Sequence, residues 1–251
     1  MANPEKLYGL IGYPLGHSMS ASFFNQKFES ENIAAEYRNF PIASIDELPG
    51  LLAQHPNLAG LNVTIPYKQQ VIPFLSDIDP LADQIGAVNV IKFTQTKDGL
   101  HLKGYNSDII GFTRSIEPLI DKNKHKAALI LGTGGASKAI KLGLEKLGLE
   151  TQYVSRQKTA QTLAYEELTH SHFKHYKVIV NCTPLGMYPN MDTCPDIPYR
   201  FLSHEHICYD LVYNPEQTLF LIKAQEQGAV TKGGLAMLIM QAHASNEIWN
   251  K

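Results

Sequence analysis

Cysteine is scarce in this chain of 251 residues, which contains only Cys182, Cys194 and Cys208. Their number is odd and no two of them have CxxC spacing, which argues against a disulfide framework and against a cysteine zinc site. Three histidines cluster between positions 170 and 175, but no cysteine or carboxylate stands beside them at metal-ligand spacing. We therefore expect no bound metal, and we interpret the histidine segment as a solvated loop.

Long apolar runs and an excess of charge are also missing. No apolar stretch approaches the roughly 18 residues that a membrane span needs, and the first residues lack the pattern of a secretory signal. The net charge is −2, so we expect neither a nucleic-acid partner nor a membrane partner. Hydrophobic residues make up 44% and charged residues 18%, which is typical of a globular domain. The composition thus predicts a reduced, cytoplasmic protein.

Short apolar runs alternate with helical patterns along the chain, which is typical of βαβ units and predicts an α/β fold. In the first half we expect these strands and helices, in chain order: strand 7–12, helix 20–30, strand 36–40, helix 45–52, strand 58–65, helix 67–75. A hairpin should follow at 87–103 around the turn Lys97-Asp98-Gly99. In the second half, after a helix at 109–120, we expect strands at 128–131, 152–154, 178–180 and 208–212.

A glycine turn follows the predicted strand at 128–131. It has the sequence Gly132-Thr133-Gly134-Gly135-Ala136-Ser137 and leads into a helical pattern. Strand, glycine turn and helix in this order are the context of a dinucleotide-binding fingerprint. Gly132 permits the tight turn, Gly134 lets the backbone approach a pyrophosphate, and the helix N-terminus supplies N–H donors. We therefore predict a Rossmann-like, doubly wound domain, with a purely structural turn as the alternative.

The end of the next strand distinguishes between the two nicotinamide dinucleotides. An NAD site usually places Asp or Glu about 20 residues beyond the fingerprint, where it binds the ribose 2′-hydroxyl. This chain has Ser155-Arg156-Gln157 there, with no carboxylate to repel a phosphate. Arg156 offers a planar fork of donors that suits a 2′-phosphate. We therefore predict NADP as the cofactor, while Arg156 as an ordinary surface arginine is the alternative.

Lys68 closes the segment Asn62-Val63-Thr64-Ile65-Pro66-Tyr67-Lys68, at the start of the helix expected at 67–75. Pro66 suits the first helical position, because its missing N–H costs nothing there. A cation in the first turn meets the positive end of the helix dipole, at a cost of roughly 0.3–1 kcal/mol. That field and partial burial ease proton release, which suits a group that transfers protons. The alternative is a surface lysine that merely follows a strand.

Seven polar and glycine-rich motifs follow one another along the chain. They are HSxS at 17–20, NVTxPxK at 62–68, GAVN at 86–89, GYNSD at 104–108, GxGGAS at 132–137, NCTPLGM at 181–187 and GLxMLxxQA at 234–242. In these motifs and in their order, the chain resembles the shikimate dehydrogenases over nearly its whole length. The resemblance implies reversible, NADPH-dependent reduction of 3-dehydroshikimate to shikimate in aromatic amino-acid biosynthesis.

The resemblance also assigns roles to individual residues. It implies a catalytic pair, Lys68 and Asp108, although Asp108 could instead cap the helix expected from 109. The substrate-binding positions are Ser18, Ser20, Asn62, Thr64, Asn89, Tyr213 and Gln241. The cofactor-binding positions are Gly132, Gly134, Gly135, Ala136, Ser155, Arg156, Thr183, Gly234 and Met237. A second basic residue often follows the arginine in this family, and Lys158 is a possible substitute for it.

The family pattern further implies two lobes with a ligand cleft between them. We expect a substrate-binding domain at 1–107, completed by a C-terminal helix at 235–251, and a dinucleotide-binding domain at 108–234. The protein would be a monomer or a homodimer. Two alternatives stay open, a quinate/shikimate dehydrogenase that uses NAD and a catalytically silent sensor of shikimate and a nucleotide. Methylenetetrahydrofolate dehydrogenases share a two-domain design but lack the HSxS and GYNSD segments.

Overall fold

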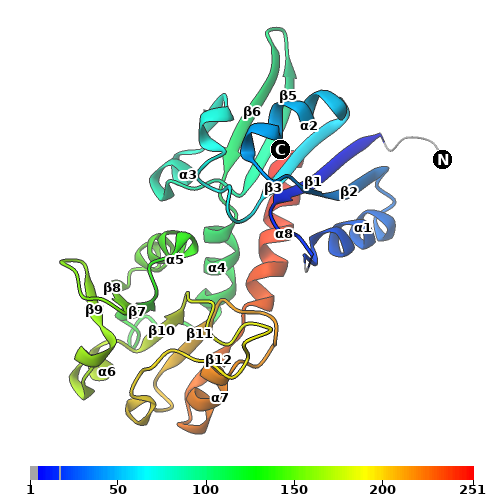
Figure 1. Ribbon diagram of the computed structural model, residues 1–251. Coiled ribbons are helices and arrows are strands. Elements are labelled where there is room, and N and C mark those ends of the chain that lie inside the picture. The colour runs from blue at the N-terminus through cyan, green and yellow to red at the C-terminus, as the bar shows by residue number, and fades with distance from the viewer. Residues whose placement is uncertain (1–4, 17) are drawn as a thin grey trace. The chain divides into compact units, whose positions relative to one another are not determined.

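The computed structural model describes residues 5–16 and 18–251, so His17 of the HSxS motif lies outside the described residues. The chain forms two compact units (Figure 1). Unit 1 comprises Met1–Ser107 and Ala242–Lys251, and unit 2 comprises Asp108–Gln241. The division between them therefore falls inside the last helix, α8 (Leu235–Asn250).

Unit 1 contains a mixed six-stranded sheet in the order β2-β1-β3-β5-β6-β4. Its strands are β1 (Lys6–Gly12), β2 (Ala35–Pro41), β3 (Leu58–Val63), β4 (Asp77–Ile78), β5 (Val90–Thr96) and β6 (Gly99–Tyr105). Strands β1, β2 and β3 are parallel, whereas β5 and β6 form the predicted antiparallel hairpin. Gly99 closes its turn with φ of +115°, a backbone conformation that favours glycine.

The helices of unit 1 agree with the sequence pattern except at one important place. They are α1 (Ser20–Ser30), the 3₁₀ turn η1 (Ile45–Glu47), α2 (Leu48–Gln54), η2 (Ile72–Phe74) and α3 (Pro80–Ile85). The helix predicted at 67–75 is wrong, because this segment consists of turns followed by η2. Pro73 explains the error, since a proline in a helix interior removes a hydrogen bond and clashes with the preceding turn.

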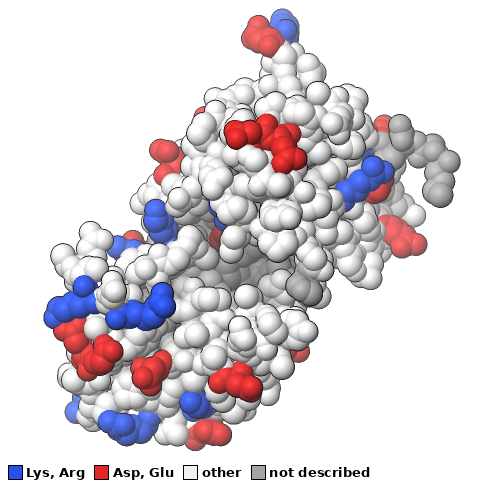
Figure 2. All heavy atoms as spheres, in the orientation of Figure 1, with Lys and Arg blue, Asp and Glu red and all other residues white. Residues whose placement is uncertain are grey.

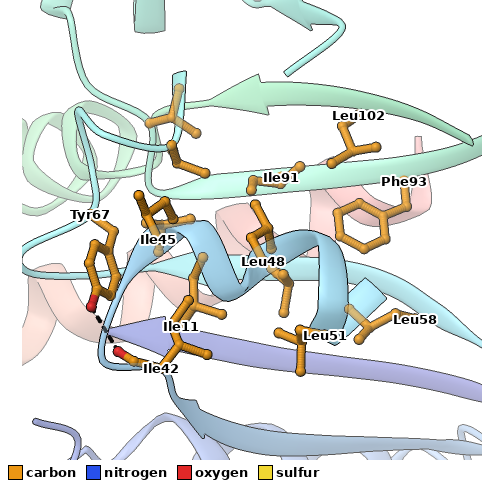
Figure 3. Close-up of a cluster of buried hydrophobic side chains, with 14 of the residues drawn as sticks. Ile11, Ile42, Ile45, Leu48, Leu51, Leu58, Tyr67, Ile91, Phe93 and Leu102 are labelled. Carbon is orange, nitrogen blue, oxygen red and sulfur yellow. Dashed lines mark hydrogen bonds between the residues drawn. The ribbon is translucent and has the colours of Figure 1, made fainter. Parts of the chain in front are cut away.

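Alternate residues of β1 contribute to two hydrophobic clusters, which lie on opposite faces of the sheet. The first cluster packs η1 and α2 against the strands through residues such as Ile11, Leu48 and Ile91 (Figure 3). The second is aromatic and includes Trp249 of α8, whose ring stacks on Tyr8 with centroids 4.6 Å apart. The indole Nε1 also donates to the carbonyl of Ile91 at 3.1 Å. The end of α8 is therefore bound to the sheet of unit 1.

Unit 2 contains a parallel six-stranded sheet in the order β12-β11-β10-β7-β8-β9. Its strands are β7 (Ala127–Leu131), β8 (Glu150–Ser155), β9 (Thr162–Ala164), β10 (Val178–Asn181), β11 (Ile207–Asp210) and β12 (Val230–Lys232). The chain builds outward from β7 in one direction and then from β10 in the other. This is the strand order of the dinucleotide-binding fold, with its switch point between β7 and β10.

Helices cover both faces of this sheet, which confirms the predicted doubly wound domain. They are α4 (Asp108–Ile116), η3 (Glu117–Leu119), α5 (Gly135–Lys146), η4 (Tyr165–Glu167), α6 (His170–His175), η5 (Tyr199–Phe201) and α7 (Leu219–Glu226). One hydrophobic cluster joins Phe112 and Ile140 to the strands, and another joins Phe173 and Phe220 to them. The histidine segment expected as a loop is helix α6 instead.

Figure 2 shows acidic and basic side chains dispersed in small groups over the visible face.

Candidate active site

In unit 1, the loops that follow the parallel strands β1 and β3 meet at one edge of the sheet. The N–H of Thr64 donates to the carbonyl of Ile11 at 3.0 Å, and the N–H of Tyr13 donates to that of Ile65 at 3.2 Å. Gly12 permits this close approach, because a Cβ there would collide with the methyl group of Thr64. The half-buried Thr64 therefore lies beside the loop that leads to the predicted carboxylate-binding serines.

Lys68 is held in place by its neighbours in the sequence. Tyr67 fills the core, and its hydroxyl donates to the carbonyl of Ile42 at 2.8 Å (Figure 3). The carbonyl of Lys68 accepts from the N–H of Val88 at 2.7 Å, one residue before Asn89. Lys68 itself is half-buried and lies in a turn. The argument from a helix dipole is therefore wrong, and partial burial is the part of that argument that remains.

A buried hydrogen-bond network joins two of the predicted substrate residues. The hydroxyl of Tyr37 donates to Asn62 Oδ1 at 2.9 Å. Asn62 Nδ2 donates to the carbonyl of Asn89 at 3.2 Å and to the hydroxyl of Ser245 at 2.9 Å. Burial raises the pKa of Tyr37, and a hydrogen bond with Ser20 opposes that rise. Tyr37 thus contacts both Ser20 and Asn62.

The same network continues to the end of unit 1. Asn89 Nδ2 donates to the hydroxyl of Ser107 at 3.1 Å, and the N–H of Ser107 donates to Asn89 Oδ1 at 2.7 Å. The hydroxyl of Ser245 donates to that of Ser107 at 3.4 Å. Sequence reasoning missed Tyr37, Ser107 and Ser245 as members of this site. Two signals were available, since Ser107 belongs to the GYNSD motif and Ser245 stands four residues after Gln241 on one helix.

The two predicted carboxylate-binding serines stand at the start of α1. Ser20 is the first residue of the helix, and its N–H donates to the hydroxyl of Ser18 at 3.3 Å. Met19 occupies the N-cap position and makes no side-chain capping bond. Ser20 therefore does not cap the helix, whereas the Ser18 hydroxyl accepts an N–H of its first turn. Substrate binding by the two serines stays what the resemblance implies.

In unit 2, Asp108 is the first residue of α4 and is only 4% exposed. Helix α4 packs against α8 at Gly111, where a Cβ would lie 2.6 Å from the Cγ of Gln241 and 2.8 Å from the carbonyl oxygen of Met237. Because Gly111 stands one turn after Asp108, the helices that carry Asp108 and Gln241 are in direct contact. A carboxylate at this position also meets the positive end of the α4 dipole.

The glycine turn has the geometry that its sequence predicts. Gly132 has φ of +97°, and a Cβ there would lie 2.8 Å from the methyl group of Thr183. Gly134 is the N-cap of α5, and Cβ atoms built at Gly134 and Gly135 meet nothing within 4 Å. The turn after β7 therefore touches the loop after β10 at the switch point and has open space beside the N-terminus of α5. These features fit the diphosphate of a dinucleotide.

Two residues at the end of β8 bear on the choice of cofactor. Ser155 ends the strand, and its hydroxyl donates to the carbonyl of Gln157 at 2.5 Å. Arg156 is exposed, in keeping with a group that binds a phosphate from solvent. Lys158 instead forms an ion pair with Glu167. Of the two basic residues, Arg156 is therefore the better candidate for the 2′-phosphate.

The remaining predicted residues lie around the ends of β10 and β11. Asn181 Oδ1 accepts from both the N–H of Thr183 at 3.0 Å and its hydroxyl at 2.7 Å. Gly234 donates its N–H to the carbonyl of Val212 at 3.0 Å, next to the half-buried Tyr213. Met237 is 4% exposed and belongs to the hydrophobic core of unit 2. Its burial indicates a packing role in addition to the position near the nicotinamide that the resemblance implies.

The described residues, 5–16 and 18–251, contain neither a candidate membrane span nor a candidate metal site. No helix in this part of the chain has the length and apolar character that a membrane span requires. Nowhere among these residues do three or more His, Cys, Asp or Glu side chains gather as a metal-binding group would.

Comparisons with known proteins identify relatives over almost the whole chain. Residues 10–91 match the family model of the shikimate dehydrogenase substrate binding domain. A shikimate dehydrogenase (NADP(+)) of Desulforamulus reducens is 36% identical over 96% of this chain and 88% of the relative.

Two solved structures are similar in fold and extent. Shikimate 5-dehydrogenase of Thermus thermophilus, in complex with NADP(H) and shikimate, has a TM-score of 0.83 and 28% identity, covering 97% of this chain and 93% of the other. Shikimate 5-dehydrogenase of Listeria monocytogenes, in complex with shikimate and NAD, has a TM-score of 0.86 and 27% identity, covering 100% and 93%.

Proposed function

The chain belongs to the shikimate dehydrogenase family, and we propose that it catalyses the reversible, NADP-dependent reduction of 3-dehydroshikimate to shikimate. It is an oxidoreductase of aromatic amino-acid biosynthesis. The observation that carries this conclusion is the 36% identity to an NADP-dependent shikimate dehydrogenase over 96% of the chain. The glycine turn at the switch point of a parallel sheet supports the cofactor assignment, because open space lies beside it at Gly134 and Gly135.

NADPH, when bound, supplies a hydride to the carbonyl carbon of the substrate. We propose that Lys68 supplies the proton that the carbonyl oxygen needs and removes it again in the reverse reaction. Asp108 is the partner that we propose for Lys68. A buried carboxylate near an ammonium group favours the protonated form, and reduction requires that form. The half-burial of Lys68 and the deep burial of Asp108 support these roles.

The other groups of the proposed site divide by chemistry. Ser18 and Ser20 bind the substrate carboxylate with hydroxyl donors, and the amides of Asn62 and Asn89 bind ring hydroxyls. The network supports this assignment because it fixes the orientation of both amides before a ligand arrives. Thr64, Tyr213 and Gln241 complete the substrate set that we propose.

We propose that NADP contacts three segments of unit 2. These are the glycine turn with Ala136, the end of β8 with Ser155 and Arg156, and the loop with Thr183. Gly234 and Met237 complete the proposed cofactor set. The absence of a carboxylate from Ser155-Arg156-Gln157 favours the 2′-phosphate of NADP over the free hydroxyl of NAD.

The test is an absorbance assay at the NADPH band with the purified chain, shikimate and NADP. We expect NADPH to form, and to form faster with shikimate and NADP than with quinate or with NAD. Faster turnover of quinate with NAD would favour the alternative of a quinate/shikimate dehydrogenase. If a folded protein binds shikimate but turns over neither shikimate nor quinate, with either NADP or NAD, it would instead be identified as a sensor.

A further inference from the structure

Asp210 is a buried acid that the proposed chemistry does not use. It ends β11, next to the switch point, and is 0% exposed. Three donors point at its two carboxylate oxygens. Asn181 Nδ2 and the N–H of Val212 bond to Oδ1, each at 3.0 Å, and the hydroxyl of Thr218 bonds to Oδ2 at 2.6 Å.

Each of these donors belongs to a different part of the carboxyl edge of the sheet. Asn181 ends β10 and uses its own Oδ1 to hold the N–H and the hydroxyl of Thr183. Val212 precedes Tyr213, and its carbonyl accepts from Gly234 at the entrance to α8. Thr218 is the N-cap of α7. One carboxylate therefore joins a loop with a proposed cofactor residue to a loop with a proposed substrate residue.

Hydrogen-bond stoichiometry limits what could replace this carboxylate. Asn181 Oδ1 already accepts two bonds from Thr183, so the orientation of its amide is fixed and Nδ2 must face an acceptor. The N–H of Val212 can only donate. Asp210 Oδ1 serves both donors at once, and Oδ2 remains for Thr218. A neutral side chain of the same shape keeps one oxygen, but its amide nitrogen cannot accept, so that the Thr218 hydroxyl loses the acceptor for its own proton.

The protonation state of Asp210 agrees with this geometry. Burial raises its pKa to about 6, while the bonds from Thr218, Val212 and Asn181 oppose the rise. The carboxylate is thus charged at neutral pH although no solvent reaches it. Burying a charge costs free energy unless hydrogen bonds compensate for it, and here Asn181, Val212 and Thr218 supply those bonds.

We propose that Asp210 is a positioning residue, whose carboxylate holds the Thr183 loop and the Tyr213 loop in the arrangement that NADP and the substrate require. The inference rests on the proposed function, because Thr183 and Tyr213 are ligand contacts only if that function holds. It deepens that function by adding a group that touches neither ligand. Asp210 acts on the two loops through Asn181 and the N–H of Val212, while Thr218 holds the second carboxylate oxygen.

The experiment compares steady-state kinetics of the wild type with those of Asp210→Asn, which keeps the shape and removes one acceptor. The loss of one or two positioning hydrogen bonds corresponds to a rise of about threefold to tenfold in KM. We expect that rise for both NADP and shikimate, with kcat changed less than threefold. A wild-type KM for both ligands in Asp210→Asn would overturn the inference.

Tyr209→Phe is the matched control, since Tyr209 precedes Asp210, is 0% exposed and bonds to Ser115 at 2.6 Å, away from both loops. We expect its KM values to stay at the wild-type level even where its stability falls. An equal rise of KM in Tyr209→Phe would show that any lost buried hydroxyl has this effect, and it would overturn the assigned role.

A second pair of variants serves if Asp210→Asn does not fold. Thr218→Ser keeps the hydroxyl that bonds to Asp210, whereas Thr218→Val removes it without a large change of shape. We expect a raised KM for NADP in Thr218→Val and recovery in Thr218→Ser; equal values in the two variants would contradict the proposal. Because wild-type turnover is measured first, failure of the proposed function appears there and is distinct from failure of this inference.

Discussion

The buried carboxylate of Asp210 predicts an unusual dependence of stability on pH. Its pKa is about 6 in the folded protein, whereas the ordinary value for an aspartate is 3.8. The difference between these two values corresponds to about 3 kcal/mol that disfavours the charged form in the folded state. The contribution of Asp210 to the free energy of unfolding is therefore fully present below pH 3.8, and it is lost as the pH rises through about 6.

The variant Asp210→Asn isolates this contribution, because it is neutral at every pH. Between about pH 4 and 7.5, the free energy of unfolding of the variant should rise relative to that of the wild type by about 2 kcal/mol. Other titrating groups are common to both proteins and cancel in the difference. Hydrogen bonds lost in the variant shift the difference in unfolding free energy by the same amount at every pH, so they do not alter its pH dependence.

The assay is urea denaturation of both proteins at several pH values. The difference between their free energies of unfolding is then compared across these pH values. The control is Tyr209→Phe, which should keep the pH dependence of the wild type. A difference that stays flat across this range, or that moves in favour of the wild type as the pH rises, would refute the reasoning about the buried charge.

Three further predictions concern the proposed ligand sites. Arg156→Ala should raise KM for NADP at least tenfold and leave the use of NAD nearly unchanged, and an equal loss with both cofactors would indicate a structural role. Gly111→Ala should raise KM for both shikimate and NADP, because the added Cβ pushes Gln241 and Met237 of α8 away from α4; Gly50→Ala, where a Cβ meets nothing within 4 Å, is its control. Gly132→Ala should abolish NADP binding and destabilise unit 2 by about 1–3 kcal/mol, since φ is +97°. Binding can be measured by titration calorimetry and stability by urea denaturation, and wild-type affinity in Gly132→Ala would contradict the assignment of the glycine turn.

Local patterns were sufficient to predict the strand, the glycine turn and the helix with which the parallel sheet of unit 2 begins. The strand at β7, the turn at Gly132 and helix α5 follow one another without a break, so that neighbouring residues determine them. The edge strands β9 and β12 were missed, because three residues each are too short for a periodic pattern. Their backbone pairing with β8 and β11 depends on partners elsewhere in the chain.

The errors in the site have different origins. The helix expected around Lys68 was predicted with Pro66 at its first position, while Pro73, a local signal inside the same segment, prevents it. The contacts of Ser245 with Asn62 and Ser107 join residues 183 and 138 positions apart, and no local pattern reports such a pair. The carboxylate of Asp210 looks like an ordinary strand end in the sequence, and only the folded sheet brings Asn181 and Thr218 to it.

The central claim is that Lys68 transfers the proton, and the most direct test is the turnover of Lys68→Ala with shikimate and NADP. Loss of a positioned acid–base group lowers the rate by about 10²–10⁴, so we predict that fall in kcat with KM for shikimate changed far less. The check on folding is that Lys68→Ala unfolds at the same temperature as the wild type. A folded Lys68→Ala protein that turns over at nearly the wild-type rate would contradict the account.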